Sequence, residues 1–245
     1  MVKFFDNAYT YDYSLPTVSL AYFIRYPNPF ATHVLSTDVI DRHVDPDTGR
    51  LHTTRIIRKQ SRLPPAVMNL LPKNILGNGS RGPNGEAQNL LLEKSTVDLK
   101  EGLMETETQN LQYRGVLSVV EKQRFARPSE LKNQSPGPNG AWKDAYTEVK
   151  TNVTFKSRFG FGRRDDAGGV VAEEKKSFFG SWSTSALQRT IESTSLNRTM
   201  KGLSKSREGM KIVMERIREG GVVGALEQMR RDRDMAMSVQ ADRAG

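Results

Sequence analysis

Several basic side chains lie between residues 25 and 62, among them Arg25, His33, Lys59 and Arg62. Arg25, Lys59 and Arg62 carry permanent charges, and His33 can carry one. Such groups bind phosphate and carboxylate oxygens through charge-assisted hydrogen bonds. Their chemistry is anion binding, which requires no bond to be made or broken.

Catalytic signatures are missing from the sequence. There is no cysteine, and the spacing of the three histidines (His33, His43 and His52) matches no zinc pattern. The sequence also lacks a Gly-x-Ser-x-Gly elbow, a His-Glu-x-x-His motif and a P-loop. We therefore expect no catalytic residue, no metal and no cofactor, and we interpret the protein as a non-enzyme.

Arg25 continues the apolar stripe of a predicted helix. Ser14 is a suitable N-cap and Pro16 suits the first turn, so a helix is expected from residue 14 to about residue 26. Its stripe has spacings of three, four and three residues: Leu15, Val18, Tyr22 and Arg25. This pattern aims a cation toward the interior. The alternative is a cation at a helix C-terminus whose side chain reaches water.

Lys59 ends a predicted strand over residues 51–59. Alternation with period two puts five residues on one face of that strand: Leu51, Thr53, Arg55, Ile57 and Lys59. Lys59 therefore points to the same side as Ile57. The alternative is a strand end that emerges into solvent, which is the commoner position for lysine.

A long amphipathic helix is predicted over residues 183–219. Its apolar stripe has one gap, which Arg207 fills, and consists of Leu196, Met200, Leu203, Met210, Met214 and Ile217. Arg207 requires a partner or a polar cavity, because an unpaired buried charge is costly. Arg198, Lys201 and Lys205 fall on the opposite side of an ideal helical wheel, where a solvated face is usual.

The remaining pattern predicts an α+β fold with a curved antiparallel sheet of six to seven strands packed on the long helix. Alternating segments bounded by turn residues place the strands at residues 3–13, 33–41, 51–59, 90–96, 102–110, 116–125 and 146–155. A short apolar segment fenced by prolines follows Arg62, over residues 63–72. We expect one domain over residues 1–220, with insertions at about 74–89, 129–141 and 156–180. A C-terminal tail over 221–245 is either a loose helix or disordered.

Composition restricts the partners of the protein. The 245 residues carry a formal net charge of +9, and no apolar run approaches the length that spans a bilayer. A basic protein of this kind attracts anionic lipid surfaces, acidic proteins or nucleic acid. Aromatic residues between arginines in the segment 156–182 favour nucleic acid weakly, but no ribonucleoprotein or cold-shock signature accompanies them. We expect no nucleic-acid partner.

Motifs in the first half of the chain resemble those of the PRELI/slowmo/Ups family of mitochondrial lipid carriers. They are Arg25-Tyr26-Pro27-Asn28-Pro29, His33-Val34-Leu35-Ser36, Thr53-Thr54-Arg55 and Leu63-Pro64. The resemblance is dense over residues 1–71, moderate over 91–125 and thin over 196–219. It is nearest to the Ups-type branch, which implies transfer of phosphatidic acid between the outer and inner membranes for cardiolipin synthesis. The phosphatidylserine carriers of the same family are the alternative.

The resemblance also implies roles for individual residues. A lipid cavity formed by the sheet would hold the headgroup near Arg25 and Lys59, with Arg62, His33, Arg198 and Lys205 as further cations. A movable lid that touches the membrane would be formed by Leu63, Pro64, Val67, Met68, Leu70 and Leu71. The family implies a peripheral protein of the mitochondrial intermembrane space that binds anionic membranes. It further implies a small helical partner with twin Cys-x9-Cys motifs.

Overall fold

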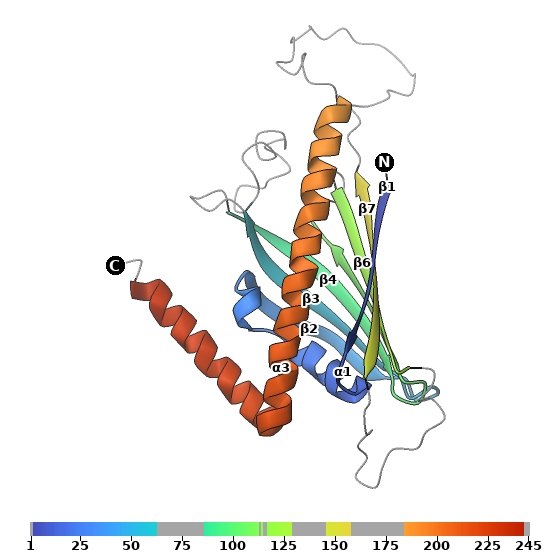
Figure 1. The fold of residues 1–245 in the computed structure, drawn as a ribbon, viewed down its shortest axis with the longest axis vertical. Coiled ribbons are helices and arrows are strands. Elements are labelled where there is room, and N and C mark those ends of the chain that lie inside the picture. Colours follow the sequence, from blue (N-terminus) through green and yellow to red (C-terminus); the bar gives the residue numbers. More distant parts are fainter. Residues whose placement is uncertain are drawn as a thin grey trace, which may run out of the picture.

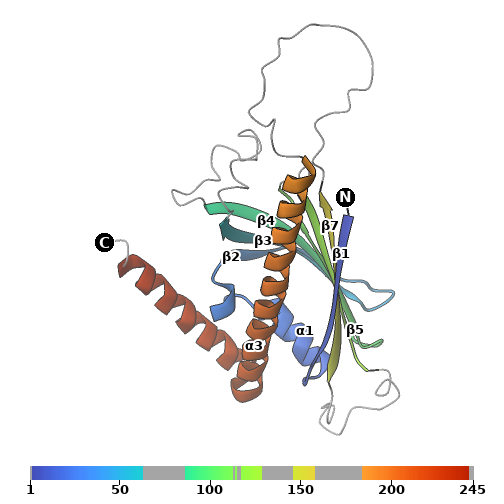
Figure 2. The same ribbon diagram turned by 45° about the horizontal axis from the view of Figure 1, so that its top comes forward.

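A seven-stranded antiparallel sheet curves around a long helix in the computed structural model of this chain (Figure 1). The structure describes residues 2–62, 86–112, 114, 117–128, 146–157 and 184–242. The long helix, α3 (Thr184–Asp242), runs along the concave side of the sheet (Figure 2). The predicted α+β architecture is therefore confirmed.

The strands lie in chain order, apart from the first strand. They are β1 (Val2–Tyr11), β2 (Val34–Val44), β3 (Leu51–Arg62), β4 (Glu86–Asp98), β5 (Leu103–Asn110), β6 (Leu117–Ala126) and β7 (Thr147–Ser157). The sheet order is β1-β7-β6-β5-β4-β3-β2, so β1 pairs with the last strand and forms one edge. Residues 86–89 and 156–157 belong to β4 and β7, which corrects the expected bounds of two insertions.

Side chains alternate between the two faces of the sheet, as the period of two requires. On β3 the buried residues are Thr53, Arg55 and Ile57, whereas Arg58 is exposed. We call the face that carries these buried residues the inner face, because α1 and α3 pack on this side of the sheet. Lys59 continues the inner face and is partly buried, so the prediction that it points to the same side as Ile57 is confirmed.

Helix α1 (Leu15–Ile24) begins and ends close to the predicted residues. Ser14 is the N-cap residue, but its hydroxyl forms a hydrogen bond with Thr17 Oγ1 at 3.0 Å instead of capping a backbone N–H. Pro16 lies in the first turn, where its missing N–H costs no helical hydrogen bond. The predicted stripe of Leu15, Val18 and Tyr22 is buried, with at most 2% of each side chain exposed.

The hydrophobic core lies at the end of the sheet where α1 packs. Val18 of α1, Met104 and Val149 of the strands, and Val213 and Met214 of α3 are all fully buried in one cluster. At the opposite end of the strands the helix stripe is less covered, and Met200 is 46% exposed. Among the described residues, the packing of α1 and α3 on the sheet is therefore concentrated at one end of the strands.

Close packing of α3 depends on a glycine opposite the loop after α1. Asn28 is the N-cap of the short 3-10 helix η1 (Pro29–Ala31), and its amide donates to the carbonyl oxygen of Arg25 at 2.6 Å. A Cβ at Gly209 would lie 2.8 Å from Asn28 Oδ1. Only a residue without a Cβ allows α3 to approach Asn28 this closely.

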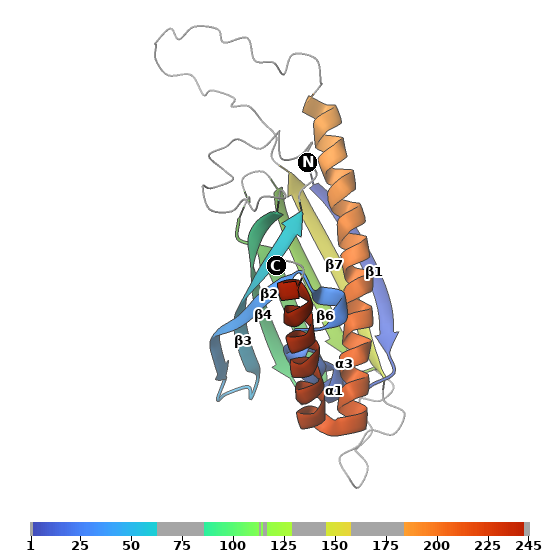
Figure 3. The same ribbon diagram turned by 90° about the vertical axis from the view of Figure 1, so that its left-hand side faces the viewer.

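After Gly221 the helix continues to Asp242 in a new direction, and it diverges from the first part of α3 with distance from the turn (Figures 1 and 3). The turn occurs at Gly221, whose φ of 63° is one that glycine adopts readily. Ala225 and Met229 are buried, and Met229 belongs to the main core cluster. Arg216 and Asp232 join the two helical parts by an ion pair of 2.7 Å. Of the two alternatives for the tail, the structure therefore shows a helix, and this helix packs on the domain.

No helix within the described ranges has the length and the apolar character needed to cross a membrane.

Candidate functional site

Arg25 points into the protein, as its place in the stripe predicts. It is the C-cap residue of α1, and only 8% of the residue is exposed. Its Nη2 donates to Glu93 Oε2 at 2.7 Å. The alternative in which the side chain reaches water is wrong, because the guanidinium pairs with a buried carboxylate.

A second arginine binds the same carboxylate. Arg55 Nε donates to Glu93 Oε1 at 2.8 Å, and Arg55 Nη2 also contacts this oxygen. Arg55 Nη1 donates to the carbonyl oxygen of Phe23, which ties α1 to β3. Sequence reasoning noted that Arg55 faces inward but did not identify Glu93. The signal that identifies Glu93 is the strand register, because the two residues lie directly opposite each other on β3 and β4.

Tyr22 completes this cluster. Its hydroxyl donates to Glu93 Oε2 at 2.8 Å, and the guanidinium of Arg25 lies 3.6 Å from the centre of its ring. Burial would raise the pKa of Glu93, but the two arginines and the hydrogen bonds hold it below its usual value. Two arginines and one carboxylate leave a net charge of +1 in the cluster. Taken by itself, this cluster therefore carries one positive charge that Glu93 does not neutralise.

Three of the residues predicted to bind the headgroup lie close to one another: His33, Lys59 and Lys205. Val34 of β2 lies opposite Lys59, and the backbone N–H of Gln60 donates to the carbonyl oxygen of His33 at 2.8 Å. Burial, Lys59 and Lys205 together lower the pKa of His33. His33 is therefore neutral at physiological pH, so it offers a hydrogen bond there and Lys59 and Lys205 supply the charge.

The side chain of Lys59 has no ion-pair or hydrogen-bond partner in the part of the chain that the structure describes. Among these residues, no carboxylate neutralises its ammonium group.

Arg207 is the cation of α3 that faces the sheet. Its guanidinium carbon lies 4.7 Å from the centre of the Tyr9 ring, and its buried Nε finds no hydrogen-bond partner among the described residues. The ring of Tyr9 is thus one neighbour of this cation, and the prediction that Arg207 requires a partner or a polar cavity stays a prediction for its Nε. Arg207 was not among the predicted headgroup residues, although its place in the apolar stripe was the signal.

The other predicted residues are exposed or lie outside the described part. Arg198 is exposed on α3, and Lys205 is exposed but close enough to affect His33. Arg62 ends β3 opposite Glu86, and its side chain is outside the described residues. The whole predicted lid also lies outside them: Leu63, Pro64, Val67, Met68, Leu70 and Leu71.

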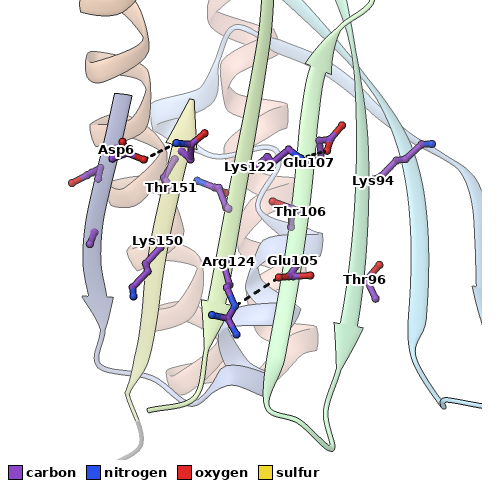
Figure 4. A pocket seen from close by; sticks show the side chains of 14 residues that line it. Asp6, Lys94, Thr96, Glu105, Thr106, Glu107, Lys122, Arg124, Lys150 and Thr151 are labelled. Atoms are coloured by element: carbon purple, nitrogen blue, oxygen red, sulfur yellow. Dashed lines mark hydrogen bonds and ion pairs between the residues drawn. The ribbon is translucent and has the colours of Figure 1, made fainter. Parts of the chain in front are cut away.

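A polar groove of about 930 Å³ lies on the opposite, outer face of the sheet (Figure 4). Its charges largely neutralise each other, since Lys122 pairs with Glu107 at 3.1 Å and Arg124 with Glu105 at 3.7 Å. These side chains are more than 40% exposed, so each pair contributes little to stability. The chemistry of the inner face therefore makes it the stronger candidate site.

Comparison with known proteins identifies the family. Residues 16–136 match the PRELI-like family. The ups1 homolog of Schizosaccharomyces pombe is 38% identical over 150 residues, which cover 60% of this chain and 72% of that protein. The chain belongs to the PRELI-like family.

Two other PRELI relatives are more distant in sequence. The protein named UPS1, mitochondrial, of Saccharomyces cerevisiae is 26% identical over 219 residues, covering 89% of this chain and 97% of that protein. Human PRELI domain-containing protein 1, mitochondrial, is 32% identical over 122 residues, covering 50% of this chain and 51% of that protein. The PRELI-like match of residues 16–136 contains Arg25, Lys59 and Glu93 but ends before Arg207.

Proposed function

We propose that this protein is a non-enzymatic carrier that moves phosphatidic acid between the outer and inner mitochondrial membranes and so supplies cardiolipin synthesis. The observation that carries the proposal is the excess of positive charge on a partly covered inner face. Lys59 and Arg207 have no hydrogen-bonded partner in the described chain, and the Arg25–Arg55–Glu93 cluster has a net charge of +1. Membership of the PRELI-like family supports the same conclusion.

The inner face offers the two environments that a phospholipid requires. A phosphate group binds best to cations that are already fixed in place, because its hydrogen bonds are then made without ordering flexible side chains. Arg25 is fixed by Glu93 and Tyr22, and the backbone of Lys59 is fixed in β3 between its neighbours β2 and β4. The acyl chains would lie along apolar inner-face residues such as Ile57, Val153 and Phe155.

Exchange with a membrane requires a cover that opens. We assign this role to the proline-fenced segment that contains Leu63, Pro64, Val67, Met68, Leu70 and Leu71. The net charge of +9 would hold the protein against an anionic membrane while the lipid moves. Arg62, His33, Arg198 and Lys205 would guide the headgroup between this cover and Lys59. Consumption of phosphatidic acid at the receiving membrane would give the transfer its direction.

We further propose that the protein works in the intermembrane space, on the surface of either membrane, together with a small helical partner that has twin Cys-x9-Cys motifs. Two of the relatives described above are named as mitochondrial proteins. A chain without cysteine can be retained there through binding to such a partner instead of through its own oxidation.

The test is transfer of fluorescent phosphatidic acid and phosphatidylserine between two liposome populations, with the protein co-expressed with its partner. We expect selective transfer of phosphatidic acid, at a rate lowered about tenfold by Lys59→Gln, which removes one phosphate contact. Lys94→Gln is the matched control, because Lys94 is exposed on the outer face of the neighbouring strand (Figure 4).

Each outcome of this test has a distinct meaning. Preferred transfer of phosphatidylserine would retain a carrier function and change the substrate. Equal losses in the two lysine variants would show that general membrane attraction, and not the inner face, accounts for the charge effect. Absence of any lipid transfer by folded protein would contradict the proposal.

A further inference from the structure

Glu121 is a second carboxylate on the inner face. The strand register aligns Glu93 of β4 with Thr108 of β5, and Thr108 with Glu121 of β6. Its neighbour Lys122 points to the outer face (Figure 4), so the alternation of the strand directs Glu121 inward. Two strand spacings separate the two glutamates, which corresponds to about 10 Å between their backbones.

The two carboxylates differ in their partners. Glu93 accepts hydrogen bonds from Tyr22, Arg25 and Arg55. Glu121 is partly buried, and its side chain forms neither a hydrogen bond nor an ion pair with any described residue. Partial burial removes part of the hydration of a carboxylate, and no described residue replaces it at Glu121, so this side chain suggests a role other than stabilising the fold.

Charged and titratable groups surround Glu121 on several elements. Lys59 of β3 and Arg25 after α1 favour its ionised form, whereas Glu93 of β4 opposes it. On the other side lies Tyr9 of β1, whose pKa is raised by burial and also by the charge of Glu121. The ring of Tyr9 contacts the guanidinium of Arg207 of α3. Burial is the largest influence and raises the pKa of Glu121 above its ordinary value. Burial and the unpaired geometry both make the proton of Glu121 easier to retain than that of Glu93.

We propose that Glu121 determines the headgroup charge that the inner face accepts, because its proton is taken up when an anionic phosphate binds beside Lys59 and Arg25. This inference rests on the proposed lipid-carrier function. An ionised Glu121 repels the phosphate, whereas a protonated one no longer repels it and can donate a hydrogen bond to it. The proton comes from solvent on binding and returns to solvent on release. The affinity for an anionic lipid therefore falls as pH rises through the pKa of Glu121.

The experiment compares wild-type protein with Glu121→Gln, which keeps the shape and removes the titratable carboxylate. Glu105→Gln is the matched control, because it makes the same change of net charge on the outer face, where Glu105 is 61% exposed. The affinity of each protein for phosphatidic acid is measured from acidic to neutral pH, by extraction of the lipid from vesicles of one composition. Titration of the phosphate itself affects all three proteins equally, so only differences between them are interpreted.

We expect wild type and Glu105→Gln to lose affinity with rising pH more steeply than Glu121→Gln. At neutral pH the variant should bind about tenfold more tightly, if the phosphate charge is taken to lie about 10 Å from the Glu121 carboxylate at an effective dielectric constant near 20. At acidic pH the three affinities should converge. Calorimetry in two buffers of different ionisation enthalpy should show greater proton uptake by wild type than by Glu121→Gln.

Parallel pH profiles and equal proton uptake in wild type and Glu121→Gln would overturn the inference and leave the carrier function intact. Weaker binding by Glu121→Gln at neutral pH would also overturn it, because the ionised carboxylate would then be attracting a group of the lipid. Failure of all three folded proteins to bind the lipid at any pH would overturn the carrier function and this inference together.

Discussion

Arg25 and Glu93 form a buried ion pair, with 2.7 Å between Nη2 and Oε2 and with only 9% and 1% of the two side chains exposed. The pair joins the end of α1 to the centre of the sheet, across 68 residues of chain. Removing one partner of a buried pair leaves a charge without compensation, which costs more than the pair itself contributes. Arg25 therefore stabilises the fold through this ion pair, in addition to being a candidate ligand for the headgroup.

Replacing Glu93 with Gln should destabilise the protein more than replacing Arg25 with Met. Glu93→Gln leaves both Arg25 and Arg55 uncompensated, at a cost of about 3–5 kcal/mol. Arg25→Met leaves Glu93 paired with Arg55, so we expect a loss of only about 1–3 kcal/mol. The free energy of unfolding in urea measures both changes.

The exposed ion pair Lys122–Glu107 supplies the control for that comparison. Lys122→Met should change the free energy of unfolding by less than about 1 kcal/mol, because both partners are solvated. Equal effects of Glu93→Gln and Lys122→Met would contradict the structural role of the buried cluster. A charge reversal at Arg25 would face Glu93 with a second carboxylate, so Lys59 is the cleaner position at which to test ligand binding.

Replacing Gly209 with Ala should destabilise α3 despite the higher helix propensity of alanine. The new Cβ would lie 2.8 Å from Asn28 Oδ1 and 2.9 Å from Nδ2, closer than such contacts normally come. Asn28 is held by its bonds to Arg25 and Phe30, so it cannot move away without losing them. We expect a loss of about 1–3 kcal/mol in the free energy of unfolding.

Gly202→Ala is the matched substitution on the same helix. No atom lies within 4 Å of a Cβ at Gly202, so helix propensity alone should decide the result. We expect a gain of about 0.5–1 kcal/mol, measured by the same urea titration. If both alanine variants are stabilised, the close approach of Asn28 to α3 is absent in solution.

The stability of Glu121→Gln relative to wild type should depend on pH. Burial raises the pKa of Glu121 above its ordinary value near 4.5, so the folded state holds this proton to a higher pH than the unfolded state. The contribution of Glu121 to stability therefore falls as pH rises from 4.5 through the folded-state pKa. The variant should have the higher melting temperature at neutral pH, and the difference should disappear below pH 4.5. A difference of the opposite sign at neutral pH would indicate that the ionised carboxylate is stabilised by a partner.

Replacing Met229 with Ala should show that the helix after Gly221 belongs to the folded domain. Met229 is 2% exposed within the main core cluster, so its truncation should cost about 2–5 kcal/mol. Met235→Ala is the control, since Met235 is 63% exposed and should change the free energy of unfolding by less than about 0.5 kcal/mol. Equal effects at the two methionines would mean that this helix does not pack on the domain.

Local periodicity was sufficient to predict most of the elements. The spacings of three and four residues predicted α1 and the burial of Arg25, and the period of two predicted β3 to β7 within a few residues. These patterns succeed because one face of each element is buried, and burial imposes the period directly on the residue types. The resemblance of the first half of the chain likewise identified the family.

The partners of the inward charges were decided only by the tertiary structure. Arg25 bonds to Glu93, which lies 68 residues away in the sequence. The first strand, β1, pairs with the last strand, β7, and forms one edge of the sheet. Nothing in the local sequence distinguishes Glu93, whose carboxylate is bonded to three residues, from Glu121, whose side chain has no partner among the described residues. Strand register and the position of α1 assign these partners, because they bring together side chains that no local period relates.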